Sequence, residues 1–178
     1  MTLTESAFVQ LCLAKFRFLV GEFGFRRIPW PDDLGEWGYQ VAFRNETTAV
    51  RVSLEREYAY VFVTLYHIVD GEIGRNPTMI DPETELFSFD LDDLICIRAQ
   101  QRSLEPKPFT APWTEEIAGR IMDEQARNLR DYAEDVLRGD FSVLVEIDKR
   151  VKQRAREQDD ELAREDAEAS SSPGDCAR

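Results

Sequence analysis

The chain has 178 residues, of which 43% are hydrophobic and 32% charged, and its formal net charge is −13. This size and composition fit one globular domain with an appendage and exclude a chain built from lipid-facing spans, so we expect no membrane association. The acidic charge also disfavours direct nucleic-acid binding, because that binding draws its affinity from Lys and Arg side chains that neutralise phosphates.

Two further features indicate the cellular setting. In the opening MTLTESAFVQLCLAKF an acidic residue, Glu5, comes before the first basic residue, Lys15, and the basic start of a secretory signal is missing, so we expect a cytoplasmic protein. The three cysteines are far apart, and Cys12 and Cys96 lie in apolar patterns, which predicts buried thiols and neither a disulfide framework nor a metal knuckle. Eighteen arginines against four lysines are typical of a GC-rich bacterial genome.

The N-terminal half predicts one helix followed by an antiparallel sheet. Thr2 is placed to cap a helix whose apolar residues recur at steps of three and four and which Gly21 or Gly24 ends. Prolines then allow only a short strand at 25–28. Three runs rich in aromatic and β-branched residues follow, joined by short polar connections, which favours an antiparallel meander of strands at 37–43, 47–54 and 58–69.

Alternation along these strands predicts which face of the sheet is buried. Val41, Val50 and Val52 belong to rows of apolar side chains on one face, with polar side chains between them. The third strand is apolar on both faces, which indicates that something also packs on the back of the sheet.

The C-terminal half predicts helices. SFDLDDLI begins a helix that ends near residue 99, and the proline-rich segment 101–113 is a linker that closes an α+β domain at 1–100. Two helices follow, joined at LRGDF, and they predict an antiparallel hairpin at 114–156. Residues 157–178 form an acidic tail that is expected to be largely disordered. Whether the hairpin covers the back of the sheet stays open.

The acids of SFDLDDLI have two interpretations. If Asp90 is the N-cap, Asp92 and Asp93 fall in the first helical turn, where free amides and the helix dipole stabilise them. Alternatively, Asp90 and Asp93 act as general acid and base together with His67, the chain's only histidine. His67 also fits a half-buried ring at the end of the third strand.

A row of aromatic residues on the third strand is a candidate protein-binding face. Tyrosines offer a large contact area with few rotatable bonds, and the row would be simply core if helices covered it. Its members are Tyr58, Tyr60, Phe62 and Tyr66. No phosphate-binding loop, nucleophile elbow or paired CxxC is present, so the sequence predicts a protein without catalytic, cofactor-binding or metal-binding residues.

Four short stretches carry a resemblance: EFGFRR, FRNETTAVRVSLE, SFDLDDLI and YAEDVLRGDF, within residues 16–145. Through them the chain resembles small bacterial α+β proteins of the immunity type, which are encoded beside toxins. The resemblance implies an acidic protein that binds and masks a basic protein partner, and homo-oligomer formation stays open. The alternatives are a small enzyme that uses the acids with His67, and a regulatory or defence-associated protein that acts through the helical hairpin.

Overall fold

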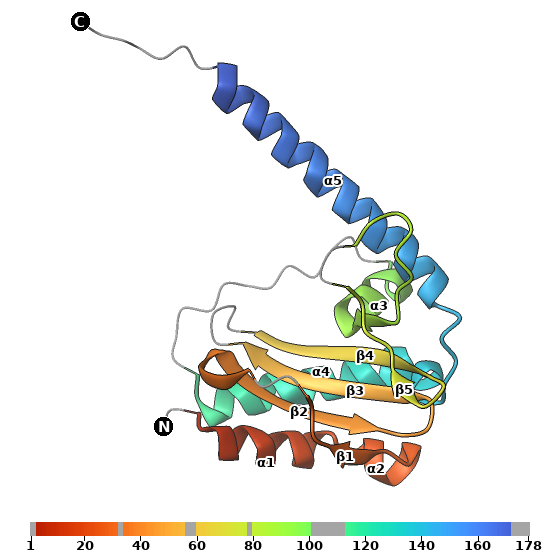
Figure 1. Cartoon of the computed structure of the whole chain (residues 1–178). Coiled ribbons are helices and arrows are strands. Elements are labelled where there is room, and N and C mark those ends of the chain that lie inside the picture. Colours follow the sequence, from red (N-terminus) through yellow and green to blue (C-terminus); the bar gives the residue numbers. More distant parts are fainter. Residues whose placement is uncertain (1–2, 32–33, 56–59, 78–79, 101–112, 172–178) are drawn as a thin grey trace, which may run out of the picture.

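The fold is α+β, as the sequence predicts. The computed structural model describes residues 3–31, 34–55, 60–77, 80–100 and 113–171. An antiparallel sheet carries helices on one face, and one long helix extends from the body (Figure 1). Within the described part of the chain, no helix is both long and apolar enough to cross a bilayer.

The N-terminal helix is divided in two. Helix α1 (Glu5–Lys15) begins after Thr4, whose hydroxyl accepts a hydrogen bond from the Ala7 N–H at 3.2 Å, and not after Thr2. Helix α2 (Arg17–Phe23) ends at Gly24, whose φ of 69° is left-handed. In one straight helix, side chains two residues apart would point about 200° from each other. The break at Phe16 lets both Phe16 and Phe18 face the core, with ring centroids 6.3 Å apart.

The predicted meander is confirmed and extended. Strands β1 to β5 lie side by side in chain order, and β6 also pairs with β4. The strands are β1 (Arg26–Ile28), β2 (Gly38–Arg44), β3 (Thr48–Glu55), β4 (Tyr60–Val69), β5 (Glu72–Ile73) and β6 (Ser88–Asp90). Asp70 and Gly71, with φ of 53° and 83°, form the two-residue turn between β4 and β5, as expected for a tight hairpin.

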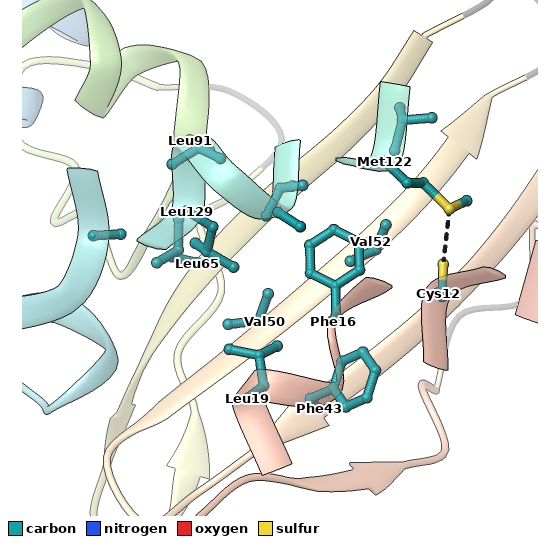
Figure 2. Close-up of a cluster of buried hydrophobic side chains, with 14 of the residues drawn as sticks. Cys12, Phe16, Leu19, Phe43, Val50, Val52, Leu65, Leu91, Met122 and Leu129 are labelled. Atoms are coloured by element: carbon teal, nitrogen blue, oxygen red, sulfur yellow. Dashed lines mark hydrogen bonds between the residues drawn. The ribbon is translucent and has the colours of Figure 1, made fainter. Parts of the chain in front are cut away.

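The predicted core face is confirmed by the register. Val41 lies opposite Val52, which lies opposite Val63, and the neighbouring rows are equally apolar. Helix α4 (Glu115–Leu137) packs with α1 on this face (Figure 1). Figure 2 shows Met122 and Leu129 of α4 among side chains from α1 and the strands. Cys12 is buried here, and its thiol donates to the Met122 sulfur at 3.9 Å.

The two last helices depart from the predicted hairpin. Helix α4 covers the core face and not the back of the sheet. Helix α5 (Leu144–Ser171) packs against α3 (Leu91–Arg98) and then extends away from the body (Figure 1). The helix also runs beyond residue 157, where the sequence predicts a largely disordered tail, because charge pairs at four-residue spacing support a polar helix. The linker at 101–112 lies outside the described residues.

Loops, and not helices, pack on the back of the sheet. Trp30, in the connection between β1 and β2, lies against Tyr66 with ring centroids 4.9 Å apart. Ala49, Ile68 and Ile73 complete this second, smaller apolar cluster. The Arg51 guanidinium lies 5.6 Å from the Trp30 ring centroid. The expectation that the third strand is packed on both faces is therefore confirmed at this end of the sheet.

Candidate functional site

The acids of SFDLDDLI, here called the acid cluster (Asp90, Asp92 and Asp93), lie where β6 passes into α3. Asp90 is the N-cap of α3, as the sequence predicts, and Asp92 and Asp93 occupy its first turn. However, the Asp90 side chain makes no capping hydrogen bond. Its carboxylate accepts instead from the Thr64 hydroxyl at 2.8 Å, because Thr64 lies directly opposite on β4.

Asp92 belongs to a chain of hydrogen bonds that crosses from the sheet to α4. The Tyr60 hydroxyl donates to Asp92 at 2.8 Å and accepts from the Gln125 amide at 3.0 Å. Gln125 is buried, and a buried amide needs a hydrogen-bond partner, which the Tyr60 hydroxyl supplies. Tyr60 therefore fixes the position of α3 relative to α4.

Burial sets the electrostatics of the acid cluster. Desolvation raises the pKa of Asp90, and the neighbouring charge of Asp93 adds to this effect. Desolvation likewise raises the pKa of Asp92, in spite of the hydrogen bond from Tyr60. Burial, followed by the charge of Asp92, also raises the pKa of the Tyr60 hydroxyl. The cluster thus holds two carboxyls that bind protons more strongly than ordinary aspartates.

Asp93 connects the acid cluster to the extended helix. Its carboxylate pairs with the Arg154 guanidinium of α5 at 2.6 Å. The Asp93 side chain is largely buried, whereas that of Arg154 is about half exposed. This ion pair holds α5 to the body one turn before its acidic stretch begins at Glu157.

The structure does not bring His67 to the acids. His67 lies opposite Thr48 and points to the core face, where its ring stacks on Phe141 at a centroid distance of 4.3 Å. Asp90 lies opposite Thr64, an odd number of residues from His67 on β4, and so points to the back face. Among the described residues, no group of three or more His, Cys, Asp or Glu side chains could hold a metal ion.

The aromatic row is only partly accessible. Tyr58 lies outside the described residues. Phe62 is half-buried and packs edge-on against Tyr60 at 5.0 Å, whereas Tyr66 is buried beneath Trp30. Sequence reasoning missed the most exposed aromatic residue among those described, Trp37, which is 66% exposed beside the start of β2. The sequence predicts a strand from residue 37, whereas in the structure Trp37 ends a short 3₁₀ turn and β2 begins at Gly38.

Sequence reasoning also missed a cleft of about 730 Å³ at the end of the β2–β3 hairpin. Its charged lining residues are three arginines, Arg26, Arg44 and Arg138, and two glutamates, Glu22 and Glu46; we name it the arginine cleft. Its walls come from EFGFRR, FRNETT and VLRG, stretches that are far apart in the chain and whose meeting no local pattern reveals.

Asn45 holds the walls of the arginine cleft together. Its side-chain amide donates to the Phe23 carbonyl at the end of α2 and to the Leu137 carbonyl at the end of α4, at 3.3 and 3.1 Å. Its side-chain oxygen accepts from the N–H groups of Thr47 and Thr48, at 3.0 and 2.8 Å. One side chain thus satisfies a turn and two helix ends.

Comparison of the chain with protein-family models, with curated proteins and with solved structures gives no match. The functional proposals below therefore depend on the residues and their geometry.

Proposed function

We propose that this chain is a protein-binding protein that engages a basic partner through α5. The observation that carries the proposal is that α5 leaves the body after its contact with α3 and continues to Ser171 (Figure 1). A polar helix that does not pack on its own domain is typical of elements that bridge to another molecule.

The charge of this segment indicates the kind of partner. Residues 157–171 contain seven acidic residues and one basic residue. Such a concentration of one charge attracts an oppositely charged protein and accelerates its association. Leu162 lies within the segment and is exposed, which offers an apolar contact among the acids. Masking of a basic toxin, as immunity-type proteins do, is one form of this function.

The experiment selects binders to the full-length protein from a library of randomised peptides at low and at high salt. We expect enrichment of Lys-rich and Arg-rich peptides whose affinity falls as salt rises, since salt screens exposed charges. The affinity should fall in a variant that neutralises three acids of α5, Asp159→Asn, Asp160→Asn and Glu161→Gln.

A matched control removes the same charge elsewhere. Three exposed acids, one in β5 and two in the loop before β6, are neutralised together, Glu72→Gln, Glu83→Gln and Glu85→Gln. This control should bind the selected peptides as the unmodified protein does. Equal loss of affinity in both triple variants would mean that total charge, and not α5, attracts the peptide. Selection of peptides without basic residues would contradict the proposal altogether.

The acid cluster favours a second candidate function, proton transfer at Asp90 and Asp92. Carboxyls whose pKa is raised by burial occur at acid–base sites, although structural networks perturb pKa values as well. A screen of hydrolase substrates tests this candidate. Turnover should be lost in Asp92→Asn and kept in His67→Gln, because His67 faces the opposite side of the sheet. Turnover that survives Asp92→Asn would reject proton transfer at these carboxyls.

A further inference from the structure

We propose that the arginine cleft binds the phosphate group of a small molecule. The site is distinct from α5 and does not depend on the proposed function. Arg26 of β1 and Arg44 of β2 lie directly opposite each other in the ladder, at the side of the cleft. Like charges at directly opposite positions destabilise a sheet.

No carboxylate of the described residues forms an ion pair with either member of this pair. Within the described residues, the Arg44 guanidinium donates to two backbone carbonyls, those of Asn45 and Gly71, at 3.4 and 3.2 Å. Arg26 is exposed, and it makes no ion pair with any described side chain. An anion between the two guanidiniums would remove their repulsion.

The chemistry of the pair selects the anion. Arginine presents a planar fork of N–H donors that matches the oxygens of phosphate and carboxylate, and it keeps its charge at any ordinary pH. Arg138, on the α4 side of the cleft, adds a third positive charge, although Glu134 pairs with it. Glu22 and Glu46 also line the cleft, and Glu22 pairs with Arg130. The choice of anion therefore rests on shape: a tetrahedral phosphate has oxygens for both guanidinium forks at once, whereas one fork occupies both oxygens of a carboxylate.

The surroundings of the pair are preformed and leave room for more than the phosphate. Asn45 fixes the β2–β3 turn to the ends of α2 and α4, so the cleft does not have to be ordered by the ligand. Phe23 supplies an apolar wall, and Arg138 stacks over the Phe23 ring at 5.1 Å. The volume accepts a phosphate that carries an organic group.

Inorganic phosphate is the probe, titrated into the full-length, ¹⁵N-labelled protein at constant ionic strength. We expect saturable changes in the amide resonances of Gly24, Asn45 and Thr47. Replacement of one guanidinium, in Arg26→Gln, should weaken phosphate binding at least about tenfold, since a charge-assisted hydrogen bond is lost. The unfolding temperature of this variant should not fall, because Arg26 repels Arg44 and has no ion-pair partner among the described residues to lose.

Arg27→Gln is the matched control. Arg27 is the next residue on β1, lies opposite Phe43 and points to the other face of the sheet, so its loss removes the same charge outside the cleft. This variant should bind phosphate within about twofold of the unmodified protein. Equal weakening by Arg26→Gln and Arg27→Gln, absence of a saturable response, or an equal response to acetate would each overturn the proposal.

Discussion

Replacement of Asn45 is the sharpest test of how the arginine cleft is built. In Asn45→Ala, four hydrogen bonds between the side chain and the backbone are lost, two at the turn and two at the ends of α2 and α4. Each contributes about 0.5–1.5 kcal/mol net. Water in the open cleft can replace some partners, so we expect the lower part of the range, a loss of about 2 kcal/mol in the free energy of unfolding.

Urea denaturation measures this loss. For a chain of this size, a change of about 2 kcal/mol moves the midpoint by about 1 M while the slope stays constant. Asn45→Asp separates the two halves of the interaction: it keeps the oxygen that accepts from the turn but loses the amide that donates to the helix ends. Its negative charge also lies beside the carbonyl end of α4, which the helix dipole disfavours.

We therefore expect Asn45→Asp to be at least as destabilising as Asn45→Ala at neutral pH. An unfolding free energy of Asn45→Ala within about 0.5 kcal/mol of the unmodified protein would refute the reasoning, because surface replacements without a structural role fall in that range. Wild-type stability of Asn45→Asp would show that the two amide donations to the helix ends contribute nothing.

Three further predictions concern the acid cluster, the core and two glycines. Burial raises the pKa of folded Asp90 above its value in the unfolded chain, so the stabilising contribution of Asp90 is complete at acid pH and is lost as pH rises through the raised pKa. Asp90→Asn should therefore unfold at a higher urea concentration than the unmodified protein at pH 7, and this difference should vanish below the unfolded pKa. Leu129→Ala should cost about 2–5 kcal/mol in urea denaturation, because Leu129 is fully buried, whereas exposed Leu162 should tolerate the same change within about 0.5 kcal/mol. Gly139→Ala should lower the unfolding temperature, since φ at Gly139 is 97° and the added carbon would lie 2.7 Å from the Thr47 hydroxyl oxygen. Gly21→Ala should raise it, because Gly21 lies in a helix and the added carbon would have no atom within 4 Å.

The sheet could be predicted from the sequence because its determinants are local. Two of the three central strands alternate polar and apolar residues, the third is rich in aromatic and β-branched residues, and short connections leave only the antiparallel arrangement. The register then follows from burying one face, which is why Val41, Val52 and Val63 meet as expected.

Elements fixed by contacts distant in sequence were harder to predict. The spacing of apolar residues up to Leu19 fits one helix, and only the burial of Phe18 beside Phe16 shows why it breaks. The position of α4 depends on its packing beside α1 on the core face, whereas its own amphipathic pattern fits either face of the sheet. The charged sequence after residue 157 resembles a disordered tail by composition, although the same charges support a helix.

The candidate site shows the same limit. A capping rule placed Asp90 correctly but could not show that the hydroxyl of Thr64, on a strand far away in sequence, donates a hydrogen bond to the Asp90 carboxylate. It could not show that His67 faces away from the acids, since that depends on the pairing of β6 with β4. The arginine cleft joins three separate stretches, and no pattern within any of them indicates the cleft.

The central functional claim is that the acidic part of α5 is the binding element. Hydrogen exchange of the full-length protein, with and without a short polylysine peptide, measures it most directly. We expect the peptide to slow exchange at 157–171 and to leave the sheet unchanged, with the protection lost at high salt. Protection confined to the sheet, with α5 exchanging as in the free protein, would contradict the account.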